Sequence, residues 1–191
     1  IHKTLAPDDP ESQSRPITVG VGGDVPTIED AIAAYVASGA IVVLFSILDV
    51  MTPAPTTPVP NGVTICGCGT IIGTITIASG AEVSIVGMHM DGDTGDAIAL
   101  TTGCLARVYR CDIVGDIDGD CALLVMISTL VQGSLAIVAD TIFVATCAII
   151  VTLDRAYSTI AVHPPWSGSP AGSVVPKTRI YADSIGSRTC C

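Results

Sequence analysis

An all-β fold, and within that class a β-solenoid, is predicted by three observations. A short run of small and β-branched apolar residues recurs with a period in the twenties, and a second set of such runs is interleaved with it. Turns rich in Gly, Asp and Thr separate the runs. The chain is 49% hydrophobic but only 4% aromatic, which suits narrow stacked coils better than a sandwich built on aromatic anchors. The first set begins at Thr74, Ala97, Ala122 and Ala148, and the second at Val83, Ala106, Ser134 and Ser158.

A repeat of this period, with no helical segment between its runs, is typical of coils that stack along one axis. One coil cannot bury its apolar side alone, so neighbouring coils share a continuous core. We therefore expect the runs to align from coil to coil. The alignment predicts that Ala97, Ala122 and Ala148 lie in register on one sheet and that Ile98 is buried.

One helix is predicted near the N-terminus, at about residues 26–38. Pro26 suits the first turn of a helix, and Thr27 is a residue type that caps one. Two acids follow directly, where the positive end of the helix dipole favours them. Gly39 ends the helix, and Ala40–Phe45 is predicted to be a buried strand.

This N-terminal pattern resembles the start of a known superfamily. The residues that carry the resemblance are Asp24–Ile32, the strand Ile41–Leu44, and the next coil at 61–72. In these features the chain is similar to the pectate-lyase-like right-handed parallel β-helix superfamily, over roughly residues 24–162. The resemblance implies a right-handed parallel β-helix whose open end is capped by the short N-terminal helix. It does not select an activity, because the scaffold serves pectin-degrading enzymes, phage tailspikes, and virion and cell-surface structural proteins.

Three segments are expected along the chain. Residues 1–23 form a polar N-terminal arm and a first strand, residues 24–162 form the β-helix with its capping helix, and residues 163–191 form a C-terminal loop and a cysteine-bearing tail. Within the β-helix, the proline-rich stretch 52–60 reads as an extended connector.

The turn acids are the strongest candidates for chemistry. If coils stack at about 4.8 Å, the acids of successive turns form one ridge. That ridge could be a Ca²⁺ site, the carboxylate pair of a glycoside hydrolase, or a set of solvated turn residues. Arg107 and Arg110 lie beside these turns and are expected to neutralise the ridge. The candidate calcium ligands are Asp91, Asp93, Asp116, Asp118 and Asp120.

Catalysis is predicted to be absent, and no cofactor is expected apart from a possible Ca²⁺ ion. Polygalacturonase-like members of the superfamily carry Gly-His-Gly and Arg-x-Lys motifs, and neither motif occurs in this sequence. Strand alternation places Met88 and Met90 inward and His89 outward, so His89 reads as a surface residue rather than a general base.

The eight cysteines predict disulfides rather than zinc, because there is no CxxC pair and the three histidines are scattered. Cys111 aligns with Met88 one coil earlier and is assigned to the core. Cys121 and Cys147 are expected to stack on adjacent coils. The terminal pair, Cys190 and Cys191, is predicted to link neighbouring chains, with an intrachain disulfide or free thiols as the alternatives. The candidate disulfide or cross-link residues are Cys66, Cys68, Cys104, Cys121, Cys147, Cys190 and Cys191.

The net charge of −10 argues against nucleic acid or an anionic membrane surface as a partner, since both need clustered Lys and Arg. The uncharged stretch Ala31–Leu48 is not read as a membrane span, because Ser38-Gly39 divides it and acids flank it. We expect a structural protein of a virion or another extracellular assembly, for example a capsid decoration or tailspike-like component. Its expected partners are further copies of this chain, in a homo-oligomer, and other structural proteins of the same assembly. A trimer is expected by analogy with virion fibres. The alternative is a β-helix protein that binds or cleaves polysaccharide.

Overall fold

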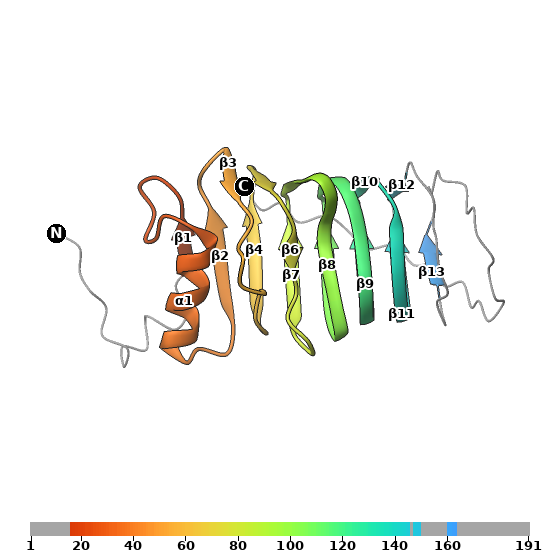
Figure 1. Cartoon of the computed structure of the whole chain (residues 1–191), viewed down its shortest axis with the longest axis horizontal. Coiled ribbons are helices and arrows are strands. Elements are labelled where there is room, and N and C mark those ends of the chain that lie inside the picture. Colours follow the sequence, from red (N-terminus) through yellow and green to blue (C-terminus); the bar gives the residue numbers. More distant parts are fainter. Residues whose placement is uncertain (1–15, 146, 150–159, 164–191) are drawn as a thin grey trace.

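The computed structural model describes residues 16–145, 147–149 and 160–163. This part of the chain forms a parallel β-solenoid of about five turns with one helix at its N-terminal end (Figure 1). The all-β class and the short helix predicted from the sequence are confirmed. The elements are β1 (Ile17–Val19), α1 (Ile28–Ser38), β2 (Val43–Ile47), β3 (Met51–Pro53), β4 (Val63–Gly67), β5 (Thr70–Ile72), β6 (Ile75–Thr76), β7 (Glu82–Val86), β8 (His89–Tyr109), β9 (Asp112–Ile127), β10 (Leu130–Gln132), β11 (Leu135–Ala145), β12 (Ala148–Ile149) and β13 (Ile160–His163).

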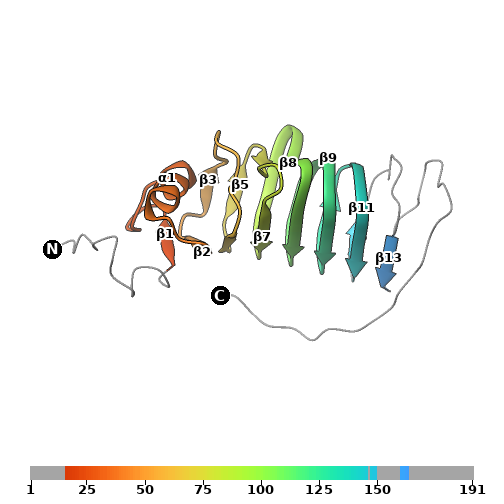
Figure 2. The same cartoon turned by 90° about the horizontal axis from the view of Figure 1, so that it is seen from below.

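Every strand pairing between the named strands is parallel, and each strand pairs with the equivalent segment of the next coil. Both views show the strands side by side along one axis (Figures 1 and 2). One ladder shows the coil length directly, since each of its members lies one coil after the previous one. The coils are unequal, and the longest begins at Val83. The members of this ladder are Val43, Val63, Val83, Ala106, Leu124 and Ile142.

The predicted register of the three alanines is wrong. Ala148 pairs with Leu130, whose partner on the preceding coil is Asp112, and this ladder does not include Ala97 or Ala122. The physical reason is the coil length. The steps between the three alanines are longer than any coil of the ladder that begins at Val43, so each later run starts further around the coil.

The interior consists of columns of like side chains, one from each coil. Phe45, Ile65, Ile85, Val108 and Met126 occupy one column and are all almost completely buried. A second column contains Ile75, Ile98, Ile117 and Leu135. Ile98 has no exposed surface, which confirms the predicted burial. Because β-branched side chains pack well on a pleated surface, these columns account for the recurring Ile and Val of the sequence.

Helix α1 covers the first coil, as both views show (Figures 1 and 2). Thr27 is its N-cap, and its side chain accepts a hydrogen bond from the Asp30 N–H. Gly39 ends the helix in the left-handed conformation with φ of 66°. The ring of Tyr35 packs edge-on against Phe45 with centroids 6.4 Å apart, and its hydroxyl lies 2.7 Å from the carbonyl oxygen of Asn61. The helix is therefore joined to the solenoid by both apolar and polar contacts.

Two local predictions need correction. The predicted strand Ala40–Phe45 begins only at Val43, and the side chains of Ile41 and Val42 are exposed. The chain is still leaving the helix at these positions and has not reached the ladder. The proline-rich connector is also partly a strand, because β3 pairs with β5 and buries Thr52. In the described part of the chain, no helix is long and apolar enough to cross a membrane.

Candidate functional site

The acids of the proposed ridge lie on β8 and β9 but not at one point. Asp96 pairs with Asp116, whereas Asp118 pairs with Ala99 and Ala136. Asp91 lies at an earlier position on β8, opposite Val114. The five candidate ligands are thus distributed along two coils, with two of them, Asp93 and Asp120, on exposed positions.

Several of these carboxylates already accept hydrogen bonds from the chain itself. Asp91 Oδ1 accepts from the Asp93 N–H at 2.9 Å, and Asp116 Oδ1 accepts from the Ser134 N–H at 2.7 Å. Asp120 Oδ2 lies 3.3 Å from the Thr102 hydroxyl. Among the described residues, no group of three or more His, Cys, Asp or Glu side chains is arranged to hold a metal ion. Ca²⁺ needs several oxygen ligands converging on one point, so this geometry does not support the predicted calcium site.

The carboxyl group of Asp96 is perturbed by its surroundings. Partial burial raises the pKa of its carboxyl group, and the charges of Asp118 and Asp116 raise it further. The ladder is irregular here, with register shifts on both sides of the Asp96–Asp116 pair. Asp96 belongs to the predicted acidic ridge but is not one of the five predicted calcium ligands, and its pairing with Asp116 depends on the irregular register.

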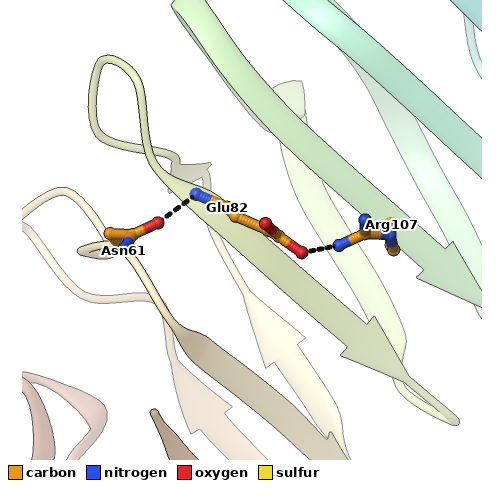
Figure 3. Close-up of polar contacts among 3 residues, drawn as sticks. All are labelled: Asn61, Glu82 and Arg107. Carbon is orange, nitrogen blue, oxygen red and sulfur yellow. Dashed lines mark hydrogen bonds and ion pairs between the residues drawn. The ribbon is translucent and has the colours of Figure 1, made fainter. Parts of the chain in front are cut away.

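A polar ladder runs along the outside of the solenoid from Asn61 to Arg107 (Figure 3). The side-chain oxygen of Asn61 accepts from the Glu82 N–H at 2.8 Å, and Glu82 Oε1 pairs with Arg107 Nη1. Arg107 thus pairs with Glu82 and not with the turn acids. For Arg107, the expectation that it neutralises the acidic ridge is wrong.

A second outer ladder joins His89, Asp112 and Gln132. His89 Nδ1 lies 3.2 Å from Asp112 Oδ2, and Gln132 Nε2 donates to Asp112 Oδ1 at 3.2 Å. Met88 and Met90 are buried while His89 is about one-third exposed, as strand alternation predicts. These side-chain contacts form only when the coils stack in this register, so they favour it over a register shifted along the strand. The alignment of Cys111 with Met88 implies that Asp112 lies opposite His89, but the side-chain contact between them and the position of Gln132 on the next, shorter coil were not predicted.

Four of the cysteines in the described part of the chain are buried inside the solenoid. Cys104 and Cys121 are direct partners in the β8–β9 ladder, and both are buried free thiols. Cys111 is buried as predicted, and desolvation raises its pKa to about 11. Cys121 and Cys147 do not stack, because Cys121 pairs with Ala139 while Cys147 Sγ lies 3.4 Å from the backbone nitrogen of Thr129.

The remaining cysteines lie at the first coils or beyond the described residues. Cys66 is half-buried on β4, whereas Cys68 is exposed and takes part in a disulfide bond. The predicted cross-linking residues Cys190 and Cys191 lie outside the part of the chain that the structure describes.

The thiols of Cys104 and Cys121 share one hydrogen bond, which shifts the pKa of both thiols. Cys121 donates to the Cys104 sulfur, and this bond lowers the pKa of the Cys104 thiol against the opposing effect of burial. The same bond and burial raise the pKa of Cys121, and the charges of Asp120 and Asp140 add to that rise. A thiolate is the reactive form of cysteine, so the pair has one poised nucleophile and one proton donor.

Two hollows lie beside the first coils. One of about 430 Å³ is bordered by Ser46–Val50 and Cys66–Gly69. The other, of about 300 Å³, is bordered by Ile41, Val42, Asn61–Thr64, Glu82 and Ser84. Exposed apolar side chains stand at their edges, with Ile41 81% and Val50 81% exposed. Apolar side chains of this size are normally covered when they are grouped.

Comparisons with protein-family models, with curated proteins and with solved structures give no match for this chain. The structure alone shows the parallel β-solenoid. The likeness to a particular superfamily rests on the N-terminal sequence pattern.

Proposed function

We propose that this chain is a structural protein of an extracellular assembly, such as a capsid decoration or tailspike-like component of a virion. The observation that carries the proposal is two pairs of exposed apolar side chains, one pair beside each hollow of the first coils. Ile41 and Val42 border one hollow, and Leu48 and Val50 border the other. Grouped apolar side chains beside a concave surface favour contact with another protein.

The interior columns support a mechanical role. Each coil contributes one large apolar side chain to each column, and backbone ladders join every coil to the next. Such a rod resists bending because deformation would break many ladder hydrogen bonds together. Membership of the pectate-lyase-like right-handed β-helix superfamily is part of the same proposal, and the Asp24–Ile32 pattern supports it.

Oligomer formation is the first test. Sedimentation velocity of the purified chain should give a homo-oligomer, with three times the chain mass of 19.4 kDa if it is a trimer. Replacing Ile41 and Val42 by Ser should weaken the assembly without unfolding the chain, because neither side chain contributes to the core. Val138→Ser is the matched control, since Val138 is 46% exposed on β11, several coils away. A monomeric parent protein would overturn the oligomer proposal.

The covalent part of the proposal has a separate test. If Cys190 and Cys191 link chains, non-reducing electrophoresis of assembled material should show multimers that disappear when both residues are replaced by Ser. The fold should survive, which circular dichroism would report. A parent protein that runs as a monomer without reductant would exclude the cross-link while leaving a non-covalent assembly possible.

A polysaccharide-cleaving function is the second candidate, and Asp96 is the observation that favours it. Burial and the charges of Asp118 and Asp116 raise the pKa of Asp96, which is the ladder partner of Asp116, and glycoside hydrolases act through two neighbouring carboxyl groups. Under the structural proposal, acidic polysaccharides incubated with the protein should yield no new reducing ends or unsaturated products. Product formation that Asp96→Asn abolishes would favour the enzyme instead.

A further inference from the structure

Cys104 and Cys121 are held together by the solenoid itself. They are Cα partners on adjacent coils, on the parallel strands β8 and β9. Adjacent strands lie about 4.8 Å apart, and bridged cysteines have Cα atoms about 4.4–6.8 Å apart. Both side chains point into the interior, with exposed fractions of 0% and 2%. The spacing of the two Cα atoms is therefore compatible with a disulfide bond between these residues.

An irregularity of the ladder gives this buried pair a route to solvent. The register shifts on both sides of the Cys104–Cys121 pairing, between Leu100 and Cys104 and again between Cys104 and Leu105. Thr102 and Gly103, directly before Cys104, are exposed, and Gly103 has a positive φ of 76°. Interrupted ladders open locally at lower free energy than continuous ones. Opening of this turn exposes Cys104 before the rest of β8 is disturbed.

We propose that Cys104 and Cys121 are a dithiol site that a small disulfide oxidises to an intercoil disulfide. The Cys104 thiolate attacks one sulfur of the oxidant, whose S–S bond breaks and whose other half leaves as a thiolate. Cys121 then loses its proton and attacks the Cys104 sulfur, so the mixed disulfide breaks and the second half of the oxidant leaves. Two protein thiols are oxidised, one external disulfide is reduced to two thiols, and the two protons end on those thiols.

The inference goes beyond the proposed function and does not depend on it, because it concerns two residues inside a single chain. Its consequence is mechanical. The new bond would join β8 to β9 covalently in the middle of the solenoid, where packing, ladder hydrogen bonds and side-chain contacts such as His89–Asp112 hold these adjacent coils. A cross-link between Cys104 and Cys121 closes a loop about one coil long, which restricts the unfolded chain and raises the melting temperature.

Peptide mapping tests the bond directly. The folded protein is equilibrated with oxidised glutathione, remaining thiols are alkylated in acid, and the chain is cut on the N-terminal side of aspartates. Residues 120–139 then contain Cys121 alone, and residues 96–111 contain Cys104 and Cys111. We expect these two peptides to appear as one linked species that reductant separates. Cys111→Ala should retain the linked species, because Cys111 is buried at a different position of the coil, whereas Cys104→Ala should lose it.

Thermal melting gives the second measurement. Oxidation should raise the melting temperature of the parent protein by about 6–12 °C. That part of the rise should disappear in Cys121→Ala and persist in Cys111→Ala, which separates this bond from the disulfide at Cys68. Absence of the linked peptide from both the folded parent and the parent refolded with oxidised glutathione would overturn the proposal. This outcome is measured on the unmodified chain, so it holds even if a variant fails to fold.

Discussion

Replacing Ile117 by Ala should test whether the interior columns hold the solenoid together. Ile117 lies between Ile98 and Leu135 on the neighbouring coils, and all three are almost completely buried. The change removes three carbon atoms, worth about 2.4 kcal/mol in transfer free energy alone. Backbone ladders on both sides keep the coils about 4.8 Å apart, so the neighbours cannot close the cavity. The free energy of unfolding should therefore fall by about 3–4 kcal/mol, within the range for such changes.

Urea unfolding followed by circular dichroism measures this loss. With a slope of about 2 kcal/mol per molar urea, the midpoint should move down by about 1.5–2 M. Val138→Ala is the matched control, because Val138 lies on an outer face of β11 and should cost less than about 0.5 kcal/mol. If Ile117→Ala and Val138→Ala unfold at the same urea concentration, the column is not a source of stability and the reasoning fails.

Three further variants test the cap and the turn acids. Tyr35→Phe should lower the free energy of unfolding by about 1–2 kcal/mol in urea titration, because the backbone carbonyl of Asn61 loses its hydroxyl donor; an unchanged midpoint would contradict this. Hydrogen bonds from Thr57 lower the pKa of Glu29, so its stabilisation is present above the unfolded value of 4.5 and is lost as the pH falls through the folded pKa. Glu29→Gln should accordingly lower the melting temperature at pH 7 and have no effect in strong acid. The pKa of Asp96 is raised, so its ionisation costs stability above the folded pKa and nothing below the unfolded value of 3.8. Asp96→Asn should then raise the melting temperature at pH 7 but not at pH 3, and equal shifts at both would refute the pKa direction.

The fold class could be predicted from the sequence because the composition, the recurring apolar runs and the helix capping residues all agree with it. Small and branched apolar residues suit narrow coils, and the helix near residue 30 has its cap at Thr27 and its stop at Gly39. The repeat length could not be predicted in the same way. Each coil carries several inward columns of similar composition, such as those of Ile65 and Ile75, so an apolar run does not reveal which column it joins.

The wrong repeat length also gave a wrong alignment of the cysteines. With a repeat in the middle twenties, Cys121 aligns with Cys147, whereas the shorter coils of the structure align it with Ala139. The pairing of Cys104 with Cys121 is harder still, because their separation along the chain differs by one position from that of the next pair, Leu105 and Leu123. Only a register shift brings the two cysteines opposite each other, and register shifts leave no mark in an apolar pattern.

The irregular coil explains why both candidate sites lie on β8 and β9. At the start of β8, the step from His89 to its partner Asp112 is longer than the step from Tyr109 to Ile127 at the end of the strand. The additional residues of β8 are accommodated at two places, between Asp91 and Ile98 and between Leu100 and Cys104. The first place holds Asp96 with its raised pKa, and the second holds the thiol pair. A regular ladder pairs all its backbone groups and fixes side chains by alternation, so perturbed groups arise where the ladder is interrupted.

The coils that follow keep the shorter length, and there the ladder from β9 to β11 runs with only one skipped position, at Asp140 opposite Ala122. Coils of that length thus form a continuous ladder without the additional residues of β8. Removing one residue between Leu100 and Cys104 should restore a regular ladder from Leu100 to Leu105 and should therefore separate the stability of this coil from the pairing of the two thiols. Stability in urea should be retained, and the linked Cys104–Cys121 peptide should be lost. A shortened chain that still yields the linked peptide would show that the irregular ladder is not what brings the two thiols together.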